Sequence, residues 1–408
     1  MGPIAKSTVK TSVVFGLRLV VQAGTLLLVA RILGAEQFGV FAGVAALAVM
    51  MGALANLGTN WVLFRDISES PLLGREVLAW AIPSTILFGT FLIALFVFAA
   101  KELVDDASIS GLVALTSIGA AEILLQPLYS LAVAEYHAMG KVAYSQMLQI
   151  VPLFLRFFAA LVVSMISLDE PFFIYSCFYF IASLVSFVFL FFGLDKRWPD
   201  FKDWRYPTFF DLKGALGFAV TNFTRLGPGE VDKVAASILL PAGLGGAYTA
   251  AVRIVTALTL PVSAMMLSAL PRLFRGVFHD DLRLYWVIYA SASIYGLLLS
   301  VLTWFLSPFF LSIFGEGYES IDSVFRALCF VVPGIVLRLV SGNVLISINK
   351  PWARVLVECL AVIFLFVLSL TLVPDFGVDG MVVALAVSEW SMAFLSIFLL
   401  LFFGLKKS

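Results

Sequence analysis

The sequence has little charge for its length. Asp, Glu, Lys and Arg together make up 13% of the 408 residues, whereas 62% are hydrophobic. A soluble domain carries about 25% charged residues and about half apolar ones. A water-soluble fold of this length cannot bury so much apolar surface, so the sequence predicts a membrane protein. The formal net charge is zero, which excludes the basic excess expected of a nucleic-acid-binding protein.

Cysteines and catalytic motifs are also scarce. The three cysteines, Cys177, Cys329 and Cys359, lie in apolar runs without metal-ligand spacing, so neither a metal site nor a disulfide framework is expected. The sequence contains no HExxH motif, P-loop or Gly-rich phosphate turn. We therefore expect a protein that is not an enzyme and that needs no cofactor.

Long apolar runs fill most of the chain instead. A helix needs about twenty apolar residues to cross the hydrocarbon core of a bilayer. By this criterion the sequence predicts an all-α polytopic membrane protein with about twelve transmembrane helices, six in each half. The expected spans are 11–33, 37–64, 77–100, 108–134, 143–167, 171–194, 211–240, 244–271, 284–311, 321–347, 352–373 and 379–404.

The longest polar connection separates the two sets of six. We expect an N-terminal six-helix bundle at 1–194, an amphipathic cytoplasmic linker at 195–210 and a C-terminal six-helix bundle at 211–408. Trp198, Trp204 and Tyr206 in this linker suit a membrane interface, where amphipathic rings settle.

Charge in the predicted loops indicates the orientation of the chain. With the N-terminus inside, the outer connections hold only two basic residues, Arg31 and Lys101. The inner segments collect Lys6, Lys10, Arg65, Arg75, Lys141, Lys196, Arg197, Lys202, Arg205, Lys213, Arg272, Arg275, Arg283, Lys350, Arg354, Lys406 and Lys407. The outer connections are acidic, with Asp105, Asp106, Asp169, Glu170, Glu316, Glu319, Asp322, Asp375 and Asp379. Because cytoplasmic loops are enriched in Lys and Arg, both termini are predicted to be cytoplasmic.

The two halves share a local pattern that indicates an internal repeat. Each has a very short outer turn between its first two spans, followed by Gly-x-aromatic: Gly39 with Phe41, and Gly246 with Tyr248. Halves with an even number of spans are expected to repeat in parallel. The alternative is that small residues recur at tight helix turns without any duplication.

Two stretches of the sequence contain recognisable motifs. In the first, residues 31–42 read RILGAEQFGVFA, and Asn56-Leu57-Gly58 and Arg65 follow. This stretch resembles the Wzx-type polysaccharide flippases, a family that has an Asp-Leu-Gly or similar triplet and an Arg at these places. Asn56 departs from the commoner Asp. The matching positions in the second stretch are Asp232, Lys233, Gly246, Tyr248, Ala250 and Pro271.

The resemblance implies membership of the multidrug/oligosaccharidyl-lipid/polysaccharide (MOP) exporter superfamily, whose members form two pseudo-symmetric six-helix bundles around a central cavity. It implies a flippase that moves an undecaprenyl-pyrophosphate-linked oligosaccharide (an O-antigen, capsule or exopolysaccharide unit) across the cytoplasmic membrane by alternating access. The implied partners are the lipid-linked glycan, the bilayer of the inner membrane, and glycan polymerase or assembly proteins.

Charged side chains inside the spans are the candidate functional residues, because each costs several kcal/mol unless it faces protein or water. Arginine suits a pyrophosphate because its planar fork binds phosphate bidentately and stays charged at any depth. The predicted substrate-binding residues are Arg18, Gln22, Asn222, Arg225, Arg253 and Arg338. Arg156 and Arg326 are weaker candidates, since each is expected near an end of its span.

Each candidate also has a structural alternative. Arg18 is close enough to the inner surface to snorkel there, and Arg253 and Arg338 have the alternative of buried ion pairs that fasten helices together. Gly-Pro-Gly at 227–229 is expected to break its helix, and broken helices at membrane depth are tolerated mainly where they line cavities. The alternative there is a structural kink with a neutralising Asp232–Lys233 pair.

Carboxyl groups inside the spans are candidates for proton or sodium coupling. They are Glu122, Asp232, Glu358 and Glu389. Glu122 and Gln126, four residues apart, form a polar stripe on one helix face. The alternative is a set of hydrogen-bonded structural carboxyls.

Two other functions stay open at this point. A cation-coupled multidrug antiporter of the same superfamily would have a mainly acidic cavity, whereas the intramembrane charges here are mostly basic. A membrane-bound glycan polymerase usually carries a large outer loop, and the outer loops predicted here are short.

Overall fold

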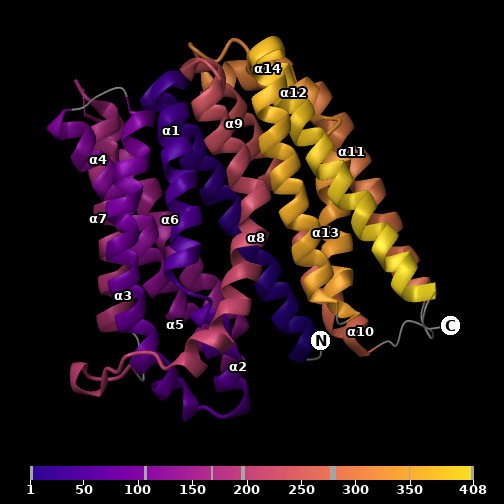
Figure 1. Cartoon of the computed structure of the whole chain (residues 1–408). Helices are drawn as coiled ribbons and strands as arrows, with labels where there is room; N and C mark the ends of the chain where they lie inside the picture. Colours follow the sequence, from indigo (N-terminus) through magenta and orange to yellow (C-terminus); the bar gives the residue numbers. More distant parts are fainter. Residues whose placement is uncertain are drawn as a thin grey trace. The chain divides into compact units, whose positions relative to one another are not determined.

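The computed structural model describes residues 3–104, 108–166, 169–193, 198–275, 282–348 and 350–405. Within these ranges the chain forms helices joined by short turns, and no strand occurs (Figure 1). Several residues named above lie outside them: Asp105, Asp106, Lys196, Arg197, Lys406 and Lys407, together with 195–197 of the predicted linker.

Two compact units make up the chain. Unit 1 comprises Met1–Leu33 and Val40–Leu226, and unit 2 comprises Gly34–Gly39 and Gly227–Ser408. The division falls inside helix α8, directly before Gly227-Pro228-Gly229. The predicted domain bounds at 1–194, 195–210 and 211–408 stay a prediction.

Unit 1 contains most of the N-terminal helices. In order they are α1 (Pro3–Ala55), α2 (Thr59–Glu69), α3 (Leu73–Ala100), η1 (Lys101–Leu103), α4 (Ile109–Gly119), η2 (Ala120–Leu125), α5 (Gln126–Ala138), α6 (Val142–Ser164), α7 (Pro171–Gly193), η3 (Phe201–Asp203) and the first part of α8 (Phe209–Leu239). Helix α7 packs against α4 and α6, and α2 packs against α3 and α5. An apolar cluster that includes the fully buried Leu63, Leu78 and Leu131 fills the space between α2, α3 and α5.

Unit 2 contains the remaining helices. They are α9 (Ala242–Leu258), α10 (Leu260–Arg275), α11 (Leu282–Phe314), α12 (Ile321–Leu328), α13 (Val332–Ser347) and α14 (Pro351–Leu405). Helix α13 packs against α10, α11 and α14, and α12 packs against α9 and α11. Val336, Val340 and Met266 belong to its buried core.

The described helices are long and apolar enough for a multi-pass membrane protein. Eight helical segments could each cross a bilayer, counting α4, η2 and α5 as one segment and α9 with α10 as another. The number is nine if α12 and α13, which are bent by 47°, form one span. Two of the eight, α1 and α14, each consist of two helices joined at a kink, at Gly34 (φ 67°) and Gly377 (φ 55°). These kinks lie between consecutive predicted spans. The all-helical membrane fold is confirmed, and the count of twelve spans stays a prediction.

The expected break at Gly-Pro-Gly is wrong. Helix α8 runs continuously from Phe209 to Leu239 with Pro228 inside it. A membrane helix tolerates a proline when its surroundings can satisfy the freed backbone groups.

The linker between α7 and α8 contacts the helices of unit 1. The Arg205 backbone N–H donates to the Ala79 carbonyl (3.0 Å), and the Arg75 guanidinium pairs with Asp203 (2.7 Å). Trp198 and Trp204 pack against the apolar cluster of α2, α3 and α5. These contacts fix the position from which α8 starts.

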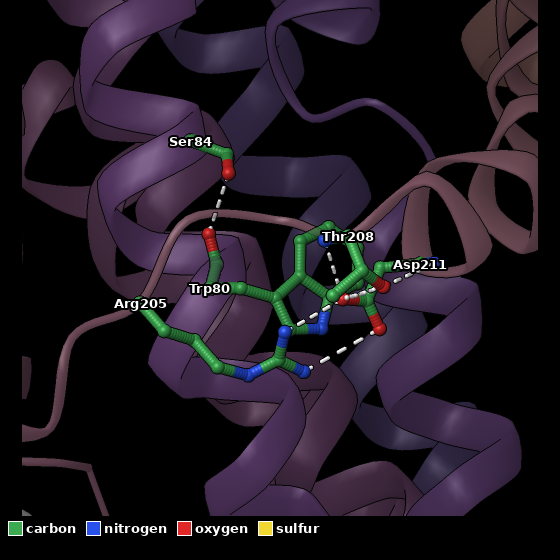
Figure 2. Close-up of polar contacts among 5 residues, drawn as sticks. All are labelled: Trp80, Ser84, Arg205, Thr208 and Asp211. Atoms are coloured by element: carbon green, nitrogen blue, oxygen red, sulfur yellow. Dashed lines mark hydrogen bonds and ion pairs between the residues drawn. The ribbon is translucent and has the colours of Figure 1, made fainter.

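A capping box begins α8. The Asp211 carboxylate accepts a hydrogen bond from the Thr208 backbone N–H (2.8 Å), and the Thr208 hydroxyl accepts one from the Asp211 backbone N–H (3.2 Å). Arg205 pairs with the same Asp211 carboxylate (2.6 Å) (Figure 2). Partial burial raises the pKa of Asp211, but the hydrogen bonds from Arg205 and Thr208 outweigh it and hold that pKa below its ordinary value.

We expect Thr208→Ala to destabilise the protein by about 1 kcal/mol, because the first turn of α8 loses its cap. The measurement is thermal unfolding in detergent. Since the pKa of Asp211 is lowered in the folded state, the contribution of the cap is complete at neutral pH and is lost as the pH falls through that lowered value. The Thr208→Ala difference should therefore shrink in acid, and a constant difference would contradict this role of Asp211.

Candidate functional site

Unit 1 contains a cavity of about 230 Å³ between α1, α5 and α6. Helix α1 contributes Arg18, and the other lining residues lie on α5 and α6. They are Gln126, Tyr129, Ser130, Val133, Gln149, Pro152, Leu153 and Arg156. No carboxylate is among the described residues that line it, so both charged side chains at the cavity are cationic.

Arg18 brings an uncompensated positive charge to this cavity. Its Nη1 donates to the neutral Gln149 Oε1 (2.9 Å), and its buried Nε has no hydrogen-bond partner. Among the residues that the structure describes, no carboxylate lies within ion-pair distance of it. A half-buried cation with an unused donor is expected to attract an anion.

Arg156, in contrast, is held by a complete set of partners. Its Nη2 lies 2.8 Å from Glu122 Oε1 and donates to Ser183 Oγ (3.0 Å). The guanidinium carbon lies 4.0 Å from the centre of the Tyr179 ring, and the Tyr179 hydroxyl donates to the same Glu122 oxygen. Its charge is therefore balanced, while one side of it faces the cavity.

A local helix irregularity places Glu122 in this network. Residues Ala120–Leu125 form the π-helical turn η2 between α4 and α5, a feature often found at functional sites. Gly52 of α1 lies against the Glu122 backbone carbonyl, where a Cβ would overlap it. The absence of a side chain at Gly52 thus lets α1 approach the π-helical turn closely.

The other unit 1 candidates do not line this cavity. Gln22, one turn after Arg18, is exposed. On α8, Arg225 donates to Asn222 Oδ1 (3.3 Å). Neither residue is among those lining the cavity. The prediction that Gln22, Asn222 and Arg225 bind substrate is untested.

In unit 2, most buried charges are paired. Arg338 Nε lies 2.5 Å from Glu389 Oε2, and Arg354 Nε lies 2.7 Å from Glu358 Oε1. Half-buried Arg253 lies over the ring of Phe38, 5.9 Å from its centre. The pairing of Arg338 is the structural alternative considered above, and the substrate-binding prediction for Arg253 and Arg338 is likewise untested.

Asp232 is the least satisfied buried carboxyl of unit 2. It is 1% exposed. Its Oδ2 accepts a long hydrogen bond from the Tyr248 hydroxyl (3.5 Å), and its Oδ1 has no partner. Lys233 instead pairs with Glu230 (3.1 Å) and donates to the Gly229 carbonyl. The Asp232–Lys233 pair considered from the sequence is therefore not formed.

Two lining residues, Arg156 and Gln149, are stronger candidates in the structure than in the sequence. Arg156 lies well inside α6, which runs from Val142 to Ser164, and not near the end of its span. Gln149 is not among the residues predicted from the sequence. A signal for both was available, because positions 149, 152, 153 and 156 follow the spacing of one helix face, and all four line the cavity.

Comparisons with known proteins agree with this fold. The family model described as polysaccharide biosynthesis protein matches residues 4–277, more than half of the chain. The structure is similar to the lipid II flippase MurJ in its inward closed conformation, at 13% identity over 96% of this chain and 87% of that one, with a TM-score of 0.73. No curated protein matches the sequence.

Two further solved structures share the fold. One is an inward-facing multidrug resistance MATE family transporter of the MOP superfamily, at 11% identity over 98% of both chains, with a TM-score of 0.70. The other is a MOP superfamily transporter from Pyrococcus furiosus, at 12% identity over 100% of this chain and 96% of that one, with a TM-score of 0.61. The fold is that of these transporters and of the flippase. The chain belongs to the polysaccharide biosynthesis protein family.

Proposed function

We propose that the protein is a flippase for an oligosaccharide linked through pyrophosphate to undecaprenol. The observation that carries this proposal is the uncompensated charge of Arg18 in the unit 1 cavity, beside Arg156. Arg binds phosphate oxygens through paired, charge-assisted hydrogen bonds, each contributing about 1.5–3 kcal/mol. Gln126, Gln149 and Ser130 add neutral groups suited to sugar hydroxyls.

The membrane setting of this proposal follows from the loop charges. The protein lies in the cytoplasmic (inner) membrane with both termini in the cytoplasm, and about twelve spans in two six-helix bundles move the cargo by alternating access. The cargo is an O-antigen, capsule or exopolysaccharide unit. Glycan polymerase or assembly proteins are its partners on the pathway.

The remaining candidate residues have assigned roles in this proposal. Gln22, Asn222, Arg225, Arg253 and Arg338 contact the cargo at other stages of transport. The carboxyl groups couple transport to a proton or sodium gradient: Glu122, Asp232, Glu358 and Glu389. The unpartnered Oδ1 of Asp232 supports a coupling role for that residue in particular.

A cation-coupled multidrug antiporter is the second candidate function. The observation in its favour is Asp232, a buried carboxyl that accepts a single long hydrogen bond. The unit 1 cavity argues against it, because its described lining has two arginines and no carboxylate. A cationic drug would be repelled there.

Reconstitution in liposomes distinguishes the two functions. The cargo is a fluorescent, short-chain lipid pyrophosphate oligosaccharide, and a membrane-impermeant quencher reports how much of it faces outward. A flippase should expose the inner-leaflet fraction within minutes, and gradients of pH and sodium identify the coupling ion. Ethidium uptake without lipid translocation would overturn the flippase proposal in favour of the antiporter.

A further inference from the structure

The unit 1 cavity has two arginines but an effective charge of one. Arg18 has only a neutral hydrogen-bond partner, whereas Arg156 forms an ion pair with Glu122. The hydroxyl of the lining residue Tyr129 donates to the Leu148 carbonyl (2.6 Å) and adds no charge. The charge that a bound anion meets is therefore set by the single carboxylate behind Arg156.

We propose that Glu122 determines how strongly this cavity holds an anionic cargo, by cancelling the charge of Arg156 and fixing its guanidinium in place. Glu122 does not itself line the cavity, so it is a positioning residue that acts through Arg156. This inference rests on the proposed function and names a determinant of affinity within the same site.

The surroundings of the ion pair hold both side chains rigidly. Helix α6 supplies Arg156, and α7 supplies Ser183, Tyr179 and the neighbouring ring of Tyr175. Phe41 of α1 lies edge-on to both tyrosine rings, at 5.2 and 5.7 Å between centroids. The Glu122 side chain is 5% exposed and that of Arg156 is 11% exposed. Arg156 thus presents a fixed, charge-balanced donor to the cavity.

A transport protein benefits from such a limit. A site must bind well enough to load its cargo and weakly enough to release it on the other side. Adding one uncompensated charge beside a bound pyrophosphate, at the effective dielectric of a partly buried site, strengthens binding by roughly tenfold to hundredfold. Glu122 would therefore prevent cargo from being held too tightly for release.

Four proteins that differ only in this charge test the proposal: wild type, Glu122→Gln, Arg156→Gln and the double variant. The probe is farnesyl pyrophosphate, and its dissociation constant is measured in detergent by titration calorimetry. Counting Arg18, Arg156 and Glu122, the net charge is +1 in the wild type, +2 in Glu122→Gln, 0 in Arg156→Gln and +1 in the double variant. We expect Glu122→Gln to bind at least about tenfold tighter, Arg156→Gln at least about tenfold weaker, and the double variant within about threefold of wild type.

A purely structural role predicts a different order. If Glu122 and Arg156 only fasten helices, each single variant weakens binding, and the double variant does not recover. Suppose that the wild type binds farnesyl pyrophosphate through Arg18, but Glu122→Gln binds it no more tightly than the wild type does. That result overturns this inference and leaves the proposed function standing. Failure of the wild type to bind farnesyl pyrophosphate overturns the proposed function as well.

Two controls keep the test interpretable. Asp322→Asn removes the same charge from an exposed pair with Arg326 on α12 and should leave the dissociation constant within about twofold. If Glu122→Gln does not fold, because a buried Arg is left unpaired, the double variant is compared with Arg156→Gln instead. The double variant must then bind farnesyl pyrophosphate more tightly than Arg156→Gln, and equal affinities overturn the proposal.

Discussion

Arg18→Ala is expected to lower lipid translocation in liposomes by roughly tenfold to more than hundredfold. The change removes the uncompensated charge of the unit 1 cavity together with the donors of the guanidinium, of which Nη1 is bonded to Gln149 and Nε has no partner. Charge-assisted hydrogen bonds of this kind each contribute about 1.5–3 kcal/mol, and about 1.4 kcal/mol is a factor of ten. The measurement is the initial rate of quencher accessibility for the fluorescent lipid pyrophosphate.

The protein offers a charge-matched control on the same helix. Arg31→Ala removes an exposed cation of α1 that does not line the cavity, and we expect it to retain most of the rate. Arg18→Lys keeps the charge but loses the planar fork, so an intermediate rate is expected. A normal rate in Arg18→Ala, with normal protein levels, would remove the main support for an anionic cargo in this cavity.

The membrane fold was predictable because its cause is distributed along the whole sequence. An apolar run of bilayer length can be recognised without knowing what it packs against. The loops predicted between such runs contain Gly34 and Gly377, the glycines at which α1 and α14 bend. The behaviour of Pro228 was not predictable in the same way. Whether a membrane helix breaks at proline depends on the groups packed around it, which the local sequence does not contain.

The candidate site was predictable only in part. A charged residue inside a span can be located from the sequence, but its partner is decided by the fold. Glu122 and Arg156 are 34 positions apart, and Arg338 and Glu389 are 51 apart. Sequence alone left Arg338 as either a cargo ligand or one half of an ion pair. The structure supplies the pairing of Arg338 with Glu389. Arg18, in contrast, has a neutral hydrogen-bond partner, Gln149, and no ion pair within the part of the chain that the structure describes.

The two glycines of the internal repeat meet in unit 2. A Cβ on Gly39 would lie 2.7 Å from the Ala242 carbonyl and 2.8 Å from the Gly246 nitrogen. A Cβ on Gly246 would overlap the backbone carbonyl of Ala35. Both glycines are therefore needed for the backbone of residues 34–39 to approach α9, which gives the repeated Gly-x-aromatic pattern a physical reason whether or not the halves arose by duplication.

Gly246→Ala is accordingly expected to be the most destabilising single-methyl change in this contact. The obstructing group is backbone, which cannot rotate away like a side chain, so the helix must shift, at a cost of about 3 kcal/mol or more. The measurements are protein yield in the membrane and the midpoint of thermal unfolding in detergent. Gly243→Ala, one turn earlier on α9, is the matched control, because its Cβ would lie 3.9 Å from the Glu36 side chain. Since alanine favours helix over glycine, the control should unfold at the wild-type temperature or slightly above it. Equal stability of the two variants would show that α9 and residues 34–39 do not need to approach as closely as the structure has them.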